Sequence, residues 1–554
     1  MHRSVRTAVT VALVAPLVIA TAHGAQATTP IDPPPAPGLP AEINDQVRAA
    51  AGTTSVAPRR TTRPWTMTQY RAQKVAWSEK NCTESTALTA TLVGEKVECA
   101  TVRTPLAWRD LSKGSMDLHI SRVAATGRGA RTLFVNPGGP GGAAGPMTLS
   151  VAALKPALKS THHIVGVDPR GTGGSTPLEC MPETLGVADS RDLSTTTRNA
   201  SRASMKAFVD ACVKKHGRYL QHITTYDTVS DHDLVRQLLV GRTTKVDWFG
   251  VSGGSWMGAW YAQYYPHSLE RVVLDANTEF TTDWRSSFAG FPMGFQRRFE
   301  GQFLPWMGRQ HATFGGGSTV TQTRRAYERV RAAAAAGRVT GLRADDVDGI
   351  LMLLMYEDAT LPYAAQFIAG TDAALRASSG AVEPALPEEL LASLGGGDPS
   401  FLTVRTAIIC NDTAFDRRTS SLEREFRENI RRFPLAAGGH DLVIGPCASW
   451  PYKPQPAPRI GTRGPMKLMV QTQYDPATPI EGARRAHRAD PRTRLLTVEG
   501  QGSHGAYLTE NACVDKVVTN YLTKGTMPRR DTSCAGVPLP NETKVMPVTW
   551  TPRR

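Results

Sequence analysis

Short apolar runs separated by helix-like stretches form the main pattern along this chain. Such runs occur at residues 132–136, 164–168, 246–249, 271–275, 467–472 and 494–498. Strand-like runs that alternate with helical patterns indicate a mostly parallel sheet with helices on both faces. We therefore predict an α/β fold built around these strands.

The stretch between the fourth and fifth runs has a different residue pattern, which is mainly helical. Residues 324–336 form an alanine-rich helical pattern, residues 347–356 an apolar helical run, and residues 422–432 carry charges at helical spacing. Strand-like runs resume at Lys467, which favours a helical lid inserted into one core over two domains in series. We expect a core at 61–277 and 461–540, a lid at 278–460 and a tail at 541–554.

The first 60 residues predict export. Arg3 and Arg6 precede an apolar run over residues 8–20, and Ala25 and Ala27 follow as a small-residue cleavage site, which is typical of a signal peptide over residues 1–27. Residues 28–60 are rich in proline and alanine and are interpreted as a linker or a pro-segment. The apolar run is too short for a lasting membrane anchor. We expect a secreted, extracellular monomer.

Composition narrows the kinds of partner and the redox setting. The net charge is +15, but the arginines are scattered and no basic stripe is interleaved with aromatic residues. Surface solvation is therefore favoured, nucleic acid is not an expected partner, and attraction to a wall or membrane surface stays open. Eight cysteines in an exported chain favour disulfides over a metal site. Many connectivities are possible, and we prefer the sequence neighbours Cys82–Cys99, Cys180–Cys212, Cys410–Cys447 and Cys513–Cys534.

A glycine-flanked serine follows the third apolar run. Gly250, Ser252 and Gly254 stand between this run and a helix-like stretch over residues 256–265. A serine at the tip of such a strand-turn-helix sits in strained backbone, and bulkier neighbours would collide where strand and helix meet. Ser252 is therefore the candidate nucleophile. Ser255 lacks the closing glycine and is expected to start the helix or support the site.

An aspartate and a histidine follow the last two apolar runs. Asp475 comes directly after the run at 467–472, and His504 after the run at 494–498. A serine hydroxyl needs a base to take its proton, and the base needs a carboxylate to hold its tautomer. Alone, each residue would more simply belong to an exposed loop. In the order nucleophile, acid, histidine, they predict a catalytic triad of Ser252, Asp475 and His504.

A glycine loop over residues 136–142 follows the first apolar run. Its amides can approach a reacting carbonyl closely, so we assign one oxyanion donor to Gly139, with Gly138 as the alternate, and the other to Gly253. Residues 139–144 also match a dinucleotide-binding fingerprint, with Asp168 as the acid that would follow it. Prolines in the loop and an extracellular setting argue against that reading.

Taken together, these residues resemble the secreted actinobacterial tripeptidyl aminopeptidases, α/β-hydrolase serine exopeptidases related to proline iminopeptidase. The resemblance covers most of residues 65–535. It includes the motifs at 136–142, 168–175, 250–254, 407–412, 475–479 and 504–505. It implies the α/β-hydrolase fold, a lid over the cleft, and release of short peptides, typically tripeptides, from free amino termini. It implies no metal and no cofactor.

The family resemblance raises two further points: which acid binds the substrate's ammonium group, and what two departures from the family pattern change. An aminopeptidase needs a carboxylate for this ammonium, and Glu279 and Asp412 are candidates, with an ordinary surface role as the alternative for each. Gly253 stands where relatives usually carry an aromatic residue. Ser503 precedes His504 where relatives often have glycine. Both departures leave the triad intact and the substrate preference open.

Two other functions fit the same sequence. A secreted carboxylesterase could use the same triad, because acyl-transfer chemistry does not itself distinguish esters from amides. A non-catalytic envelope-binding protein could keep the fold, although an intact triad argues against it.

Overall fold

A computed structural model describes residues 64–180, 185–187, 189–387, 398–455 and 457–552. The expected signal peptide and the linker or pro-segment lie outside the described residues. The described part of the chain contains no helix long and apolar enough to span a membrane.

One nine-stranded sheet forms the core, in the order β1-β2-β4-β3-β5-β6-β7-β8-β9. β2 runs antiparallel to its neighbours β1 and β4, and the strands from β4 to β9 run parallel. The six predicted strands are confirmed as β3 to β8, and β1, β2 and β9 are additional. The strands are β1 Glu98–Pro105, β2 Ser115–Val123, β3 Arg131–Asn136, β4 His162–Val167, β5 Val246–Val251, β6 Leu269–Asp275, β7 Lys467–Thr472, β8 Thr493–Glu499 and β9 Thr532–Ala535.

Helices cover both faces of the sheet, as the alternating pattern predicts. Apolar side chains of α5, α6 and α22 bury one face, and those of α8, α9 and α21 bury the other. Burial of this apolar surface is the main force that holds the layers together. The core helices are α3 Met67–Arg71, α4 Glu84–Val93, α5 Gly145–Leu154, α6 Pro156–Thr161, α7 Thr195–Leu220, α8 Thr225–Val240, α9 Gly253–Tyr264, α21 Ile480–Ala489 and α22 Ala512–Lys524.

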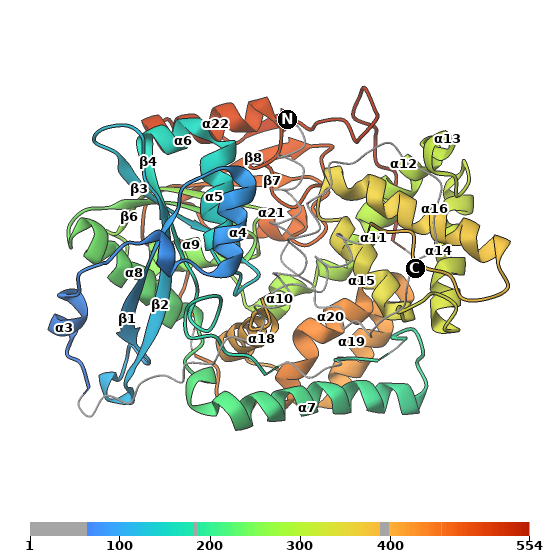
Figure 1. The fold of residues 1–554 in the computed structure, drawn as a ribbon, viewed down its shortest axis with the longest axis horizontal. Helices are drawn as coiled ribbons and strands as arrows, with labels where there is room; N and C mark the ends of the chain where they lie inside the picture. The colour runs from blue at the N-terminus through green and yellow to red at the C-terminus, as the bar shows by residue number, and fades with distance from the viewer. Residues whose placement is uncertain (1–63, 181–184, 188, 388–397, 456, 553–554) are drawn as a thin grey trace.

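The chain between β6 and β7 is a helical insertion that lies beside the sheet (Figure 1). Most of its first helices share a hydrophobic cluster of their own, which includes Phe295, Phe303 and Leu351. The insertion contains α10 Trp284–Phe288, α11 Phe291–Arg297, the π-helical turn η3 Arg298–Phe303, α12 Leu304–Arg309, α13 His311–Phe314, α14 Val320–Ala335, α15 Ala344–Leu354, η4 Asp358–Thr360, α16 Leu361–Ala377, α18 Phe401–Asp412, α19 Thr419–Arg432, α20 Ala437–Ile444 and η5 Gly445–Ser449.

The insertion is fastened to segments from both ends of the chain. Helix α7 precedes β5 but runs along α18, α19 and α20 (Figure 1), where Arg198 pairs with Asp441 at 2.9 Å and Glu423 at 3.1 Å. Near the C-terminus, Trp550 Nε1 donates a hydrogen bond to Glu300 at 2.9 Å. The segment that we expect to be a C-terminal tail therefore contacts the insertion through Trp550.

All eight cysteines are paired. Disulfides join the four pairs of sequence neighbours that we preferred, and no cysteine is free in the chain. Two of these bonds brace the region around the insertion: Cys180–Cys212 anchors α7, and Cys410–Cys447 joins α18 to η5.

Candidate active site

Ser252 stands at a sharp turn between β5 and α9. Its backbone has φ +58° and ψ −122°, a strained conformation for a residue with a side chain. A Cβ atom on Gly250 would collide with the carbonyl of Gly254, and one on Gly254 would collide with the carbonyl of Asn136. The flanking glycines are thus required by close backbone approach, as the sequence pattern predicts. The Ser252 side chain is partly exposed and its hydroxyl makes no hydrogen bond to any described residue.

Asp475 and His504 form a hydrogen-bonded pair at the same edge of the sheet. The carboxylate of Asp475 is fully buried and lies 2.9 and 3.1 Å from His504 Nδ1. Backbone amides of Ala477 and Thr478 donate to the same carboxylate at 2.9 and 2.8 Å, which fixes its orientation. This pairing leaves Nε2 of His504 as the ring nitrogen available for proton transfer.

Asp275, at the end of β6, connects the serine turn with the histidine loop. Its carbonyl accepts a hydrogen bond from the Ser252 amide at 2.9 Å. Its side chain accepts from the amides of Ala506 and Tyr507 at 2.8 to 3.1 Å, just after His504. Burial raises the pKa of this carboxyl to about 6, although the amide hydrogen bonds oppose the shift. Asp275 therefore links the positions of Ser252 and His504.

The glycine loop lies directly against the serine turn. A Cβ atom on Gly253 would lie 3.1 Å from the amide nitrogen of Gly139 and 3.0 Å from that of Pro140, so a larger residue at 253 would press on the loop. Among the described residues, neither the Gly139 amide nor the Gly253 amide donates a hydrogen bond. Two close, unused amides can stabilise an oxyanion. The departure at Gly253 thus has a steric reason.

The insertion contacts the histidine loop through residues 356–358. The amide of His504 donates to the carbonyl of Tyr356 at 2.6 Å, and the two rings meet edge to face with centroids 5.1 Å apart. The amide of Asp358 donates to Ser503 Oγ at 3.0 Å. Ser503, the second departure from the family pattern, therefore holds the insertion against the histidine loop.

The two acids expected to receive a substrate ammonium have other partners. Glu279 forms two hydrogen bonds with Arg485, at 2.9 and 2.6 Å. Asp412, the last residue of α18, is buried against the beginning of α8, where it accepts from the amide and hydroxyl of Thr225. Burial raises the pKa of Asp412 to about 7, with the Thr225 hydrogen bonds opposing. Because both carboxylates are already engaged, neither is offered to a substrate in this structure.

Glu357 is an acid without a cationic partner, next to Tyr356. It forms no ion pair among the described residues, because the nearby Arg298 bonds Asp358 at 2.6 Å instead. Burial, and then the charge of Asp358, raise the pKa of Glu357 well above its usual range. Its side chain nevertheless keeps partial exposure. Glu357 is thus a largely buried acid with partial exposure, and it adjoins Tyr356, whose carbonyl and ring contact His504.

Arg405 of α18 is a second ionisable group without an ion-pair partner among the described residues. Its side chain is 8 % exposed, and no hydrogen bond or ion pair links its guanidinium to any described residue. Burial lowers its pKa to about 10. The ring of Phe401, 5.4 Å from this guanidinium, packs against Gly139 of the glycine loop.

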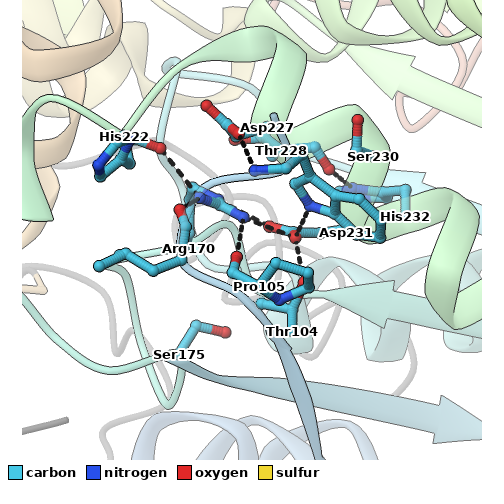
Figure 2. A network of polar contacts seen from close by, with 12 residues as sticks. Thr104, Pro105, Arg170, Ser175, His222, Asp227, Thr228, Ser230, Asp231 and His232 are labelled. Carbon is cyan, nitrogen blue, oxygen red and sulfur yellow. Dashed lines mark hydrogen bonds and ion pairs between the residues drawn. The ribbon is translucent and has the colours of Figure 1, made fainter. Parts of the chain in front are cut away.

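Residues 168–175, one of the motifs of the family resemblance, have a structural role beside the site. The five guanidinium N–H groups of Arg170 are all bonded: two to Asp231 at 2.7 and 2.8 Å, and three to the carbonyls of Pro105, Leu106 and His222 (Figure 2). Asp168 accepts from the amide of Ala144 at 2.8 Å. Asp168, the acid that a dinucleotide-binding site would use, therefore anchors the glycine loop.

Comparison with known proteins now assigns the family. Residues 131–325 match the family model described as "alpha/beta hydrolase fold", and residues 435–534 match the one described as "TAP-like protein". The two matches contain Ser252 and the pair Asp475 and His504, respectively. The chain belongs to the α/β-hydrolase family.

Curated relatives of this α/β-hydrolase refine the assignment. It is 28 % identical to a tripeptidyl aminopeptidase of Streptomyces coelicolor, over 79 % of this chain and 83 % of the relative. It is 26 % identical to serine protease Hip1 of Mycobacterium tuberculosis, over 75 % and 83 % of the two chains. It is also 26 % identical to carboxylesterase B of the same species, over 84 % and 90 %. The predicted resemblance is confirmed, and the chain is a serine peptidase of this family.

Sequence reasoning did not identify Asp275, Glu357 or Arg405. Asp275 ends a predicted strand. This strand end lies beside the ends of the strands that lead to Ser252 and Asp475, and that position was the sequence signal that could have identified Asp275. Glu357 and Arg405 lie in the helical insertion, where charged residues are common. Their distinguishing property is the lack of a partner, which depends on residues far away in the sequence.

Proposed function

We propose that this serine peptidase removes short peptides, typically tripeptides, from free amino termini. Ser252 attacks the scissile carbonyl while His504 Nε2 takes its proton, and Asp475 stabilises the resulting imidazolium. The amides of Gly139 and Gly253 bind the oxyanion. His504 then protonates the leaving amine, and water releases the peptide from the acyl-enzyme.

The observation that carries this proposal is the carboxyl of Glu357, which lies against Ser503 of the histidine loop and has no cation paired with it among the described residues. A buried carboxylate without a cation is costly, and a substrate ammonium would supply the missing partner. Such binding would lower the pKa of Glu357 again, so amine binding and deprotonation are linked. Glu357 replaces Glu279 and Asp412 as the proposed receptor of the amino terminus.

The insertion supports cleavage at chain ends. Its segment 356–358 is bonded to the histidine loop, and Phe401 packs on the glycine loop, so it covers the site from two sides. A covered site admits a chain end more readily than the middle of a folded chain. We propose that the insertion acts as the lid, and that the four disulfides reflect export from the cell.

A substrate series tests this proposal. Cleavage of a tripeptide anilide with a free amine is compared with cleavage of its N-acetylated form. We expect acetylation to lower kcat/KM by about 100-fold, because Glu357 would face an uncharged group. The variant Glu357→Gln should lose most of this discrimination, whereas the matched control Glu279→Gln should keep it. Equal rates on both substrates would contradict the exopeptidase assignment.

An esterase is the second candidate, favoured by the similarity to carboxylesterase B over most of both chains. It predicts fast turnover of simple aryl esters, no effect of Glu357→Gln on that turnover, and slow cleavage of both anilides. Ser252→Ala should abolish either activity, so this variant tests the shared site independently of the substrate.

A further inference from the structure

The guanidinium of Arg405 is buried without any acceptor in the described part of the chain. Buried arginine normally pairs with a carboxylate, because the cost of removing its charge from water is otherwise not offset. Other buried arginines of this protein follow that rule: Arg170 bonds Asp231, and Arg298 bonds Asp358. Arg405 departs from it, although burial leaves its pKa high enough for a charge at neutral pH.

Arg405 also occupies a position at the reacting end of the site. Its backbone nitrogen lies 3.3 Å from where a Cβ atom on Gly141 would be, and its guanidinium lies beside Phe401, which contacts Gly139. Tyr356, whose ring contacts His504, is the group that opposes the effect of burial on the pKa of Arg405. Arg405 therefore has its backbone against the glycine loop and its guanidinium beside Phe401, close enough to Tyr356 for an electrostatic interaction.

We propose that Arg405 is a substrate-binding residue that receives a carboxylate of the peptide near the scissile bond. This inference rests on the proposed function and adds a preference to it. A planar guanidinium can bond a carboxylate through two parallel N–H groups, which supplies both charge and orientation. The enzyme would then favour acidic groups at this place over uncharged ones.

Two sources of carboxylate fit the same chemistry. One is the C-terminal carboxylate of a tetrapeptide, which lies on the residue that leaves after tripeptide release. The other is an aspartate or glutamate side chain next to the scissile bond in a longer peptide. Tetrapeptides as free acids and as amides test the first source. Amidated hexapeptides with Glu or Gln at the third or fourth position test the second.

The experiment measures the ratio of kcat/KM between each acidic substrate and its uncharged partner. The wild type should prefer at least one acidic substrate by about 10- to 100-fold, since charge-assisted hydrogen bonds have this strength. In Arg405→Met the ratio should fall to about 1, and in Arg405→Lys it should stay intermediate. Arg329→Met is the matched control, because Arg329 already bonds Asp372; its ratio should equal that of the wild type.

Binding to Ser252→Ala, measured by calorimetry with the same pairs, gives a readout that does not need turnover. Weaker binding of the acid to the double variant Ser252→Ala, Arg405→Met would support the subsite. A wild-type ratio near 1 for every pair, or an equal loss on acidic and uncharged substrates in Arg405→Met, would overturn it. If free-amine peptides are cleaved but no acid is preferred, this inference fails while the proposed function stands. If the free-amine peptides are not cleaved at all, the proposed function fails.

Discussion

Arg170 and Arg405 are both buried, yet their surroundings are opposite. Arg170 uses all five N–H groups on Asp231 and three carbonyls (Figure 2), whereas Arg405 has no acceptor among the described residues. The same contrast separates Ser255 from Ser252 and Asp412 from Glu357. Polar groups that are satisfied within the fold hold it together, and we propose that Glu357 and Arg405, which lack ionic partners, bind the substrate.

The two serines give the largest expected difference. Ser252→Ala should lower kcat on the order of 10⁴- to 10⁶-fold, because the attacking oxygen is lost. Ser255 is fully buried and bonds the Ser252 carbonyl at 2.6 Å. Ser255→Ala should therefore keep activity within about 10-fold of the wild type. Steady-state assays of both variants check this; a fully active Ser252→Ala would refute the nucleophile.

The second largest expected difference is in the stability of variants at the two arginines. Arg170→Met leaves the buried Asp231 without its cation and should cost about 3–5 kcal/mol of unfolding free energy. Arg405→Met removes a charge that has no partner, so its stability should be unchanged or higher by up to about 3 kcal/mol. Denaturant melts of the two variants measure this. A large loss in Arg405→Met would show that Arg405 holds the fold together.

The buried acid Asp412 should make stability depend on pH. Its folded-state pKa is raised to about 7 by burial, above the value near 4 of an unfolded chain. The folded form thus binds the proton more tightly, and this stabilisation is lost as pH rises from about 4 to about 7. Asp412→Asn should remove that slope, which amounts to at most about 4 kcal/mol. Unfolding at pH 5 and pH 8 tests it; an unaltered slope in the variant would argue against this role.

The contact between the insertion and the histidine loop should give the smallest effect. Ser503→Gly restores the residue common in relatives but removes the hydrogen bond from the Asp358 amide. We expect a loss of about 1 kcal/mol in stability and a several-fold rise in KM for free-amine peptides, because Glu357 adjoins this contact. A conservative Ser503→Thr variant should behave more like the wild type. KM values that match across all three proteins would contradict a positioning role.

The sequence could predict the core strands and the turn of Ser252 because these are local patterns. β5 reads as a short apolar run, and the glycines at 250 and 254 mark a close approach that the backbone confirms. Strands β1 and β2 escaped prediction, since residues such as Arg103 and Asp117 interrupt their apolar positions. These two charges are tolerated because Arg103 and Asp117 lie opposite each other in the hairpin and form an ion pair at 3.6 Å.

The substrate-binding acids could not be chosen from sequence for a different reason. Glu279 is a candidate from the sequence, with an ordinary surface role as the alternative, and Arg485, from a helix more than two hundred positions later, neutralises it. The sequence around Glu357 does not indicate that Arg298 pairs with Asp358 and so leaves Glu357 without a cation. Glu357 is therefore not among the acids predicted from the sequence. Whether a charge is free depends on every element packed around it, and that information appears with the tertiary structure.

The most direct test is to trap the nucleophile with a substrate-like inhibitor. A tripeptidyl fluorophosphonate with a free amine and its N-acetylated form are each reacted with the protein, and the adduct is located by peptide mass spectrometry. The account predicts one adduct, on Ser252, formed at least about 10-fold faster by the free-amine reagent. An adduct on another residue, or equal rates with both reagents, would contradict it.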